Sequence, residues 1–344
     1  MEPRTGHIMT TNVTGKLGRA IMTCLAAASL VALAACAGES AQGDNTEPAA
    51  EGEPATIRLI IGPVFYEPVR IAEQEGIFED YNLDVQVMDG NTASENAAQL
   101  IAGQADIAMS GGVSVIQGAV EGLGIRAILG ATSSDPEVPT SGMVTTPESG
   151  IESCADLEGK TVGLQGLNET THLGTLLCAQ EAGIDPSTIT FVQLPLPNLN
   201  DAVMTGEIDA AYTIGAFYGA GLEAGLIEFA TPSNDVLAYG PSVVYAASDD
   251  YVEQNGDAVE RFQQAMVEAH ELGIADNFAK IRDVQREYSQ LDPDFIANSI
   301  IAGYQTDLYE SGLQRTLDGM FEFGFISRAV EIDEVVSPVA PLVP

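Results

Sequence analysis

The chain has 344 residues, with 13 lysines and arginines against 50 aspartates and glutamates, and a formal charge of −37 at pH 7. This charge excludes a duplex nucleic-acid binder, because phosphate recognition depends on basic side chains. Hydrophobic residues make up 45% of the sequence and charged residues 18%, which is a globular composition. At about 100 to 200 residues per domain, the length predicts two domains.

Residues 1–35 have the pattern of an export signal. Lys16 and Arg19 precede an apolar stretch that ends at residue 35 and is shorter than the about 20 residues that a membrane span needs. The sequence Leu33-Ala34-Ala35-Cys36 resembles the bacterial lipoprotein box, which implies that Cys36 is lipidated and is the first mature residue. The alternatives are an ordinary signal peptide with an incidental Cys36, and a start at Met9.

Residues 36–55 are rich in alanine, glycine, glutamate and proline and show no periodicity, which predicts a flexible tether. We therefore expect an extracytoplasmic protein that is held at the cell membrane by the lipid on Cys36.

Two cysteines remain in the mature chain, Cys154 and Cys178. An oxidising compartment favours a disulfide between them, and two buried thiols are the alternative. A nucleophilic pair of Cys178 with His172 is disfavoured, because their spacing places them about 120° apart on one helix. No metal site is expected, because the sequence has no CxxC and the mature histidines are only His172 and His270.

An internal duplication organises the body of the chain. Residues 103–108 and 206–211 share the pattern GxxDxA at an offset of 103 residues, and residues 72–77 match 179–184 upstream. The elements between these matches agree in kind and order, so each copy is predicted to be βαβαβα. The predicted strands are 57–61, 85–88, 107–109, 161–164, 190–194 and 210–212. The predicted helices are 66–75, 93–102, one that begins near Ser114, 170–182 and 199–205.

Such alternation predicts an α/β protein with mostly parallel sheets and helices on both faces. Ligands bind beyond the carboxyl ends of parallel strands, so loops from both copies are expected to line one cleft. These four binding loops are residues 62–66, 110–114, 165–171 and 213–217. The strands at 141–146 and 242–247 are expected to cross between lobes as a hinge. Residues 249–325 have helical periodicity and are expected to pack on the first lobe.

Several segments together resemble the solute-binding proteins of bacterial ABC importers, specifically the group that takes nitrate, alkanesulfonates, taurine and thiamine-precursor pyrimidines. The resemblance covers residues 56–330 and rests on the order and spacing of short motifs in 68–78, 100–108, 151–163, 170–172 and 206–211. It implies a two-lobed periplasmic-binding-protein fold of type 2, with residues 56–140 and 243–335 in lobe 1 and 141–242 in lobe 2. It further implies a small-molecule solute, and an ABC permease and its ATPase as partners. We expect a monomer without a cofactor.

In that family the four binding loops contact the ligand. Carried over by position, the contacts are Phe65, Tyr66, Ser110, Ser114, Asn168, Thr170, Thr171, His172, Thr213 and Phe217. For Ser114 and Thr170 the alternative is a helix N-cap, for Phe217 and Tyr212 an ordinary core position, and for His172 a surface position.

None of the ten bases of the mature chain falls within the binding loops, and only Arg70 could reach in from the first helix. An anionic ligand would therefore be held by helix N-termini and hydroxyl groups. No catalytic residue is predicted, since no nucleophile motif or carboxylate pair falls in these loops. A thiamine-pyrimidine-synthase-like enzyme and a solute-sensing lipoprotein remain as alternative functions.

Overall fold

The computed structural model describes residues 52–289 and 291–344, which form one compact unit. The predicted signal peptide, Cys36 and residues 36–51 of the predicted tether lie outside the described residues. The first strand begins at Ala55, at the predicted end of the tether. No helix in the described residues is long and apolar enough to cross a membrane.

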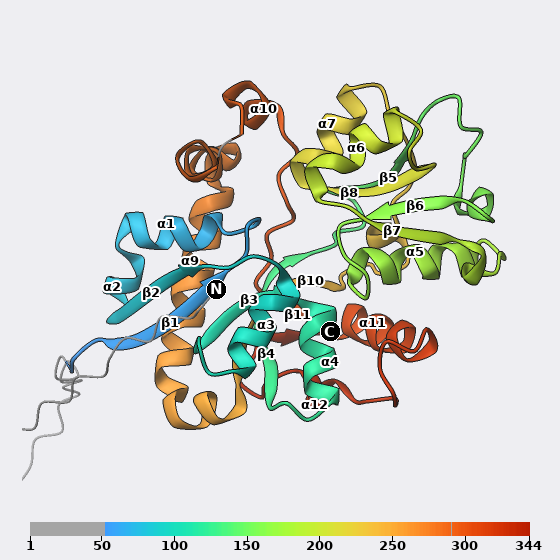
Figure 1. Ribbon diagram of the computed structural model, residues 1–344. Helices are drawn as coiled ribbons and strands as arrows, with labels where there is room; N and C mark the ends of the chain where they lie inside the picture. The colour runs from blue at the N-terminus through green and yellow to red at the C-terminus, as the bar shows by residue number, and fades with distance from the viewer. Residues whose placement is uncertain (1–51, 290) are drawn as a thin grey trace, which may run out of the picture. The chain divides into compact units, whose positions relative to one another are not determined.

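Two five-stranded sheets form the two lobes (Figure 1). The first has the order β2-β1-β3-β10-β4, in which β1 is parallel to β2 and β3 while β10 is antiparallel to β3 and β4. Its strands are β1 (Ala55–Ile61), β2 (Leu83–Asp89), β3 (Ile107–Gly111), β4 (Ile125–Ser133) and β10 (Pro241–Ser248).

The second sheet repeats this arrangement in the order β7-β6-β8-β5-β9. Here β5 is the antiparallel strand and lies between β8 and β9, as β10 lies between β3 and β4. Its strands are β5 (Ser141–Thr145), β6 (Thr161–Leu164), β7 (Thr190–Gln193), β8 (Ala210–Ile214) and β9 (Ile227–Ala230). Each crossing strand therefore completes the sheet that it enters.

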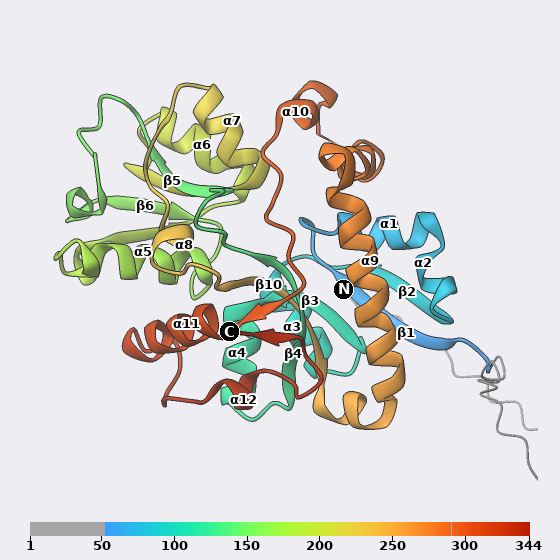
Figure 2. The same cartoon turned by 180° about the vertical axis from the view of Figure 1, so that it is seen from behind.

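Helices cover both faces of each sheet. On the first sheet, α3, α4, α11 and α12 cover one face and α1, α2 and α9 cover the other (Figure 2). Successive side chains of β10 point to opposite faces of the sheet: Val244 packs in one core cluster and Tyr245 in the other. The helices of this lobe are α1 (Glu67–Glu75), α2 (Ile77–Asp80), α3 (Ala93–Ile101), α4 (Gly112–Val120), α9 (Asp249–Tyr288), α10 (Pro293–Asn298), α11 (Glu310–Glu322) and α12 (Ile332–Val335).

The second sheet is covered by α5 on one face and by α6 and α7 on the other. The elements around it are η1 (Cys154–Leu157), α5 (Thr170–Glu181), η2 (Pro186–Thr188), α6 (Leu196–Met204), α7 (Gly215–Glu223) and α8 (Pro232–Asp235). Two short strands near the C-terminus, β11 (Leu308–Tyr309) and β12 (Leu342–Val343), pair in parallel.

The predicted strands and helices of both copies are confirmed to within a few residues, and three details differ. Strands β4 and β9, the edge strands beside β10 and β5, were not predicted. The predicted loops at 110–114 and 213–217 are direct junctions, because β3 ends at Gly111 and α4 begins at Gly112, while β8 ends at Ile214 and α7 begins at Gly215. Helix α4 therefore starts two residues before Ser114.

The periodicity at 249–325 predicts a helix through residues 299–307, and there it is wrong. This segment is extended and lies along β4, where the N–H of Gly130 donates to the carbonyl of Thr306 (2.9 Å) and that of Ser133 to Gly303 (3.0 Å). The preceding helix α10 contacts lobe 2, with the rings of Phe295 and Phe217 6.0 Å apart. Helix α10 and the extended segment together therefore contact both lobes, as the two predicted crossings do.

The repeated aspartate of GxxDxA has the same backbone role in both copies. In lobe 1 the N–H of Asp106 donates to the carbonyl of Arg58 (2.9 Å), and its Oδ2 accepts the N–H of Arg58 (2.8 Å). In lobe 2 Asp209 makes the same pair of bonds with Thr161, at 2.9 and 2.8 Å. The motif therefore joins the start of one strand to the neighbouring parallel strand.

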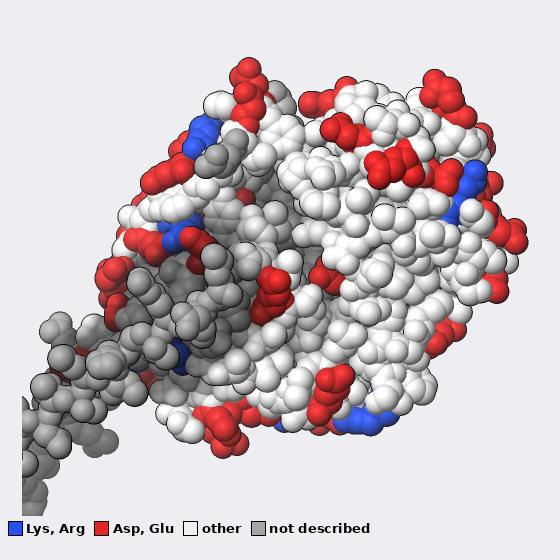
Figure 3. All heavy atoms as spheres, viewed as in Figure 1, with Lys and Arg blue, Asp and Glu red and all other residues white. Residues whose placement is uncertain are grey.

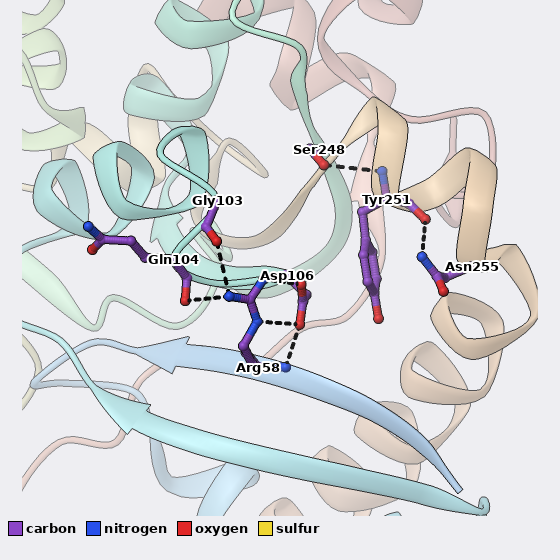
Figure 4. Close-up of polar contacts among 7 residues, drawn as sticks. All are labelled: Arg58, Gly103, Gln104, Asp106, Ser248, Tyr251 and Asn255. Carbon is purple, nitrogen blue, oxygen red and sulfur yellow. Dashed lines mark hydrogen bonds and ion pairs between the residues drawn. The ribbon is translucent and has the colours of Figure 1, made fainter. Parts of the chain in front are cut away.

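The first copy adds a charged partner to this contact. The guanidinium of Arg58 donates to both carboxylate oxygens of Asp106 (3.0 and 2.6 Å) and to the carbonyls of Gly103 (3.0 Å) and Gln104 (3.4 Å), as Figure 4 shows. In the second copy the nearest base is Lys160, with Nζ 4.0 Å from Asp209. Hydrogen bonds to charged groups contribute about 1.5 to 3 kcal/mol, so we expect Asp106 to contribute more to stability than Asp209.

We predict that Asp106→Ala lowers the free energy of unfolding by about 2 to 3 kcal/mol, because the strand N–H of Arg58 loses its partner and its guanidinium keeps only the carbonyls of Gly103 and Gln104. Asp209→Ala should cost less, about 1 to 2 kcal/mol. Urea unfolding measures both, with the exposed Asp80→Ala as a control that changes stability by less than about 0.5 kcal/mol. Equal losses for the two aspartates would contradict this account of the repeat.

A disulfide joins Cys154 of η1 to Cys178 of α5, the pair expected from the sequence. It closes a loop with a sequence separation of 24, which corresponds to about 3 kcal/mol of stabilisation by restriction of the unfolded chain.

We predict that the double variant Cys154→Ala with Cys178→Ala unfolds at about 3 kcal/mol lower stability than the oxidised protein. The intact mass of the exported protein without reductant should be lower by two hydrogen atoms than after reduction. Two thiols that react with an alkylating reagent in the folded, unreduced protein would refute the bond.

Candidate solute-binding cavity

A cavity of about 330 Å³ lies between the carboxyl ends of the parallel strands of the two sheets. Its wall combines residues after β1, β2 and β3 of lobe 1 with residues after β6 and β7 of lobe 2. About half of the wall residues have hydroxyl or amide side chains: Asn91, Thr92, Ser94, Ser110, Ser114, Thr132, Ser133, Ser134, Thr140, Ser141, Gln165, Thr170, Thr171, Gln193, Ser233 and Ser242. The arrangement is suited to a small molecule that has both polar and apolar parts.

The crossing strands form part of this wall. Ser134 and Ser242, at the two crossings, have their Oγ atoms 3.2 Å apart, and the carbonyl of Thr140 accepts the N–H of Gly215 (2.7 Å). The start of β10 approaches α4 so closely that a Cβ at Gly112 would lie 2.2 Å from the carbonyl oxygen of Pro241. A molecule in the cavity therefore touches the residues about which the lobes would turn.

Three helices begin at the cavity. The first turn of α3 contributes Ser94, that of α4 contributes Ser114, and that of α5 contributes Thr170 and Thr171. The N-caps of α4 and α5 are Gly111 and Glu169, and neither makes a side-chain cap bond. The alternative that Ser114 and Thr170 are N-caps is therefore wrong. The N–H groups of a helix start carry partial positive charge and attract acceptor atoms.

Two hydroxyl groups in the wall have no partner for hydrogen bonding. They are the buried Oγ1 atoms of Thr132 and Thr171, one from each lobe. Because a buried polar group without a partner is costly, a bound molecule that pairs with these atoms gains affinity. Ser110 is already engaged, since its Oγ donates to the carbonyl of Ala93 (2.6 Å).

Glu169 is the one acidic side chain in the wall of the cavity, among the described residues. Its Oε1 accepts the hydroxyl of Ser94 (3.2 Å), a bond that joins lobe 2 to lobe 1. Burial raises the pKa of the Glu169 carboxyl, and the bond from Ser94 opposes this effect. The cavity therefore offers one strong acceptor among many donors.

No lysine or arginine lines this cavity in the described part of the chain. Arg70 lies instead in a neighbouring groove of about 950 Å³, where its guanidinium pairs with Glu73 (2.7 Å) and Asp89 (2.6 Å). It also lies over the ring of Tyr288, 4.9 Å from the centroid. On the face drawn in Figure 3, acidic side chains are spread over both lobes and basic ones are few.

Ten ligand contacts were predicted from the resemblance. Five of them line the cavity: Phe65, Ser110, Ser114, Thr170 and Thr171. Tyr66 and Phe217 line the neighbouring groove. Thr213 lies fully buried in β8 beside Gly142 of β5, and Asn168 faces His172. The binding role of each of these residues remains a prediction.

His172 is half-buried and does not line the cavity. Its ring lies 4.5 Å from that of Phe191 and 5.3 Å from that of Phe325, and its Nδ1 accepts the N–H of Asn168 (3.0 Å). Burial lowers the pKa of the His172 imidazole to about 4, so the ring is neutral at physiological pH.

The aromatic residues near the binding loops serve mainly as core. Tyr212 is 1% exposed, and its hydroxyl is 2.5 Å from the Oγ of Ser233. Tyr218 is also buried, whereas Tyr239 is exposed and its ring lies tilted against that of Tyr309, with the centroids 4.9 Å apart. Phe65 is the aromatic residue in the described wall, and it has a positive φ of 63°. Such a conformation is strained for a bulky residue and is concentrated at functional sites.

Sequence reasoning missed several wall residues. Asn91, Thr92 and Ser94 follow β2, and Gln193 ends β7, both at strand ends that were not assigned to the cleft. Ser133, Ser134, Thr140 and Ser141 flank the first crossing, and Ser242 lies at the second. The run of hydroxyl residues at 132–134 beside a hinge strand is the signal that could have identified them.

Comparison with known proteins supports this architecture. Residues 66–277, more than half of the chain, match the family model described as NMT1/THI5 like. The chain belongs to this family. A relative in Schizosaccharomyces pombe, a 4-amino-5-hydroxymethyl-2-methylpyrimidine phosphate synthase, is 21% identical over 214 residues. The match covers 59% of this chain and 60% of that enzyme, so the chain spans about three fifths of the relative's length.

Solved structures show the same fold. The alkanesulfonate-binding protein SsuA from Xanthomonas axonopodis pv. citri, bound to MOPS, superposes with a TM-score of 0.68 at 18% identity, over 85% of this chain and 100% of that one. The periplasmic nitrate-binding protein NrtA from Synechocystis PCC 6803 gives a TM-score of 0.68 at 15% identity, over 84% and 86%. The two-lobed periplasmic-binding-protein fold of type 2 is thereby confirmed.

We predict that His172 makes the protein less stable as the pH falls from about 6.5 to about 4. Over this range the unfolded chain binds a proton at His172 and the folded protein does not, so protonation favours unfolding. The variant His172→Asn should show a smaller loss of unfolding free energy over the same range, measured by urea unfolding at each pH. An unchanged pH slope would contradict the buried, neutral imidazole.

Proposed function

We propose that this protein is an extracytoplasmic solute-binding lipoprotein of an ABC importer. It captures one small solute in the cavity between its lobes and delivers it to a permease. The lobes, residues 56–140 with 243–335 and residues 141–242, close about the crossing strands β5 and β10. Export, the lipid on Cys36 and a monomeric state complete the proposal.

The observation that supports this function best is the position of the cavity. It lies where parallel strands of both sheets end, three helices begin and the crossings meet. A solute held there contacts both lobes and both crossings, so its binding energy favours the closed arrangement. The membership of the NMT1/THI5-like family and the fold of the sulfonate- and nitrate-binding proteins are consistent with this role.

The polar groups of the cavity narrow the class of solute. Helix N-termini and hydroxyl groups provide donors for ring nitrogens, carbonyls or a small anion. Glu169 provides an acceptor for an N–H group and repels a sulfonate or nitrate when it is ionised. An aminopyrimidine has ring acceptors and an amino donor on one small molecule. We therefore propose a pyrimidine-like solute ahead of the anionic classes, sulfonate, taurine and nitrate.

Thermal unfolding tests the proposal with 4-amino-5-hydroxymethyl-2-methylpyrimidine, methanesulfonate, taurine and nitrate side by side. A solute at about 100 times its Kd stabilises the protein by about 2.7 kcal/mol, which raises Tm by about 5 °C. We expect this shift with the pyrimidine and a smaller one with the anions. If no class of solute shifts Tm and the protein chemically converts one of these solutes, the proposed receptor function is contradicted.

We further predict that Glu169→Gln weakens binding of the aminopyrimidine by about tenfold to a hundredfold, because it removes a charged acceptor. The same change should leave binding of methanesulfonate unchanged or strengthen it. Calorimetric titration measures both, with the exposed Glu158→Gln of the same lobe as a control of equal charge change. A loss of affinity for the sulfonate in Glu169→Gln would contradict the assigned role.

A second candidate function is a pyrimidine-phosphate synthase, because that is the name of the curated relative. Among the described residues, no group of three or more histidine, cysteine or acidic side chains could hold a metal ion, and both described histidines are packed away from the cavity. Product analysis of the purified protein with the bound solute separates the two functions, since a receptor returns the solute unchanged.

A further inference from the structure

A side pocket of about 80 Å³ adjoins the central cavity. It lies between the turn that precedes α1, the start of α7 and the extended segment after α10, so both lobes contribute to its wall. It shares wall residues with the central cavity: Pro63, Val64, Phe65, Ile214 and Ala302. The two spaces therefore border the same residues of both lobes.

A buried carboxyl group lies in the wall of the side pocket. Glu67 is 4% exposed, its Oε2 accepts the hydroxyl of Tyr304 (2.6 Å), and its Oε1 accepts the amide of Gln285 (2.7 Å). A carboxylate has about four acceptor positions, so these two bonds and the bond from the backbone N–H of Glu67 itself leave capacity for one more donor. Among the described ion pairs, none includes Glu67.

Other groups in the wall of the side pocket can also interact with a hydrogen-bond donor or a cation of a ligand. The Oε1 of Gln285 is buried without a hydrogen-bond partner, and it is an acceptor. The aromatic residues Phe65, Tyr66, Phe217 and Tyr304 complete the wall, and it contains no lysine or arginine among the described residues. Aromatic faces attract cations, and the attraction is larger where water is excluded.

We infer that the side pocket binds an ammonium group of the solute, with Glu67 as its counter-ion and the surrounding rings as a partial cage. This inference rests on the proposed function, because it assigns a second subsite to the same solute. A pyrimidine that carries an aminomethyl group would place its ring in the central cavity and its ammonium group at Glu67.

The electrostatic state of the empty pocket agrees with this assignment. Burial raises the pKa of the Glu67 carboxyl, and the bonds from Tyr304 and Gln285 oppose the increase. Burial, and after it the charge of Glu67, raises the pKa of Tyr304 and of Tyr245, and the Tyr245 hydroxyl is buried without a partner. Arg70, which faces Tyr66, is already paired with Glu73 and Asp89. A cationic ligand would supply the positive charge that this cluster lacks.

A matched pair of ligands tests the inference by calorimetry at pH 7. The pair is 4-amino-5-aminomethyl-2-methylpyrimidine, which carries an ammonium group, and its 5-hydroxymethyl analogue, which does not. We expect the wild-type protein to prefer the ammonium ligand by at least about tenfold. Glu67→Gln should abolish this preference, whereas Glu75→Gln, on the same helix at its exposed end, should retain it. Equal affinities in the wild type, or a preference that survives Glu67→Gln, would overturn the inference.

A second measurement separates this inference from the proposed solute class and does not depend on the folding of a variant. If neither pyrimidine binds, the solute class is wrong, and the side pocket is tested directly on the wild-type protein with methylammonium chloride. Saturable shifts of the ring resonances of selectively labelled Phe217 and Tyr304 are expected in the NMR spectrum. Methanol and an equal concentration of sodium chloride are the controls. Shifts that are absent, or equal with methanol, would refute the subsite.

Discussion

The exchange of one strand between the two lobes is the constraint on which the rest of the structure depends. Strand β5 leaves the first lobe and enters the second sheet antiparallel, between β8 and β9, and β10 returns in the equivalent place between β3 and β4. Each sheet is complete only with the strand that the other lobe's connection supplies. The exchange brings the carboxyl ends of both sets of parallel strands to the cavity, and the crossings become part of its wall.

Scarcity of basic side chains determines how this protein can bind a solute. An arginine can hold an acidic ligand through two parallel hydrogen bonds. Here the described cavity offers helix starts, hydroxyl groups and one carboxylate, and Arg70 is paired with acids in the neighbouring groove. Such a surface recognises the pattern of donors and acceptors on a solute more than its net charge. In the function proposed above, the acidic groups of Glu169 and Glu67 favour solutes with N–H donors over anions.

The duplicated pattern in the sequence was sufficient to predict most of the fold. The repeat GxxDxA specifies a real contact, because Asp106 and Asp209 make the same two bonds to the neighbouring strand. The wall of the cavity was predicted only in part. Phe65, Ser110 and Thr170 follow from loop position, whereas Ser134 and Ser242 meet only when two distant crossings lie side by side. His172 and Tyr212 were ambiguous because burial depends on packing against residues far along the chain, such as Phe325 and Ser233.

The most direct test of the central claim is a crystal structure of the protein with the solute that gives the largest thermal shift. The account predicts that the solute lies between the lobes, with acceptor atoms at the starts of α3, α4 or α5 and a donor within hydrogen-bonding distance of Glu169. It also predicts contact with Ser134 or Ser242 at the crossings. A solute held by an arginine or lysine, or bound outside the space between the two sheets, would contradict it.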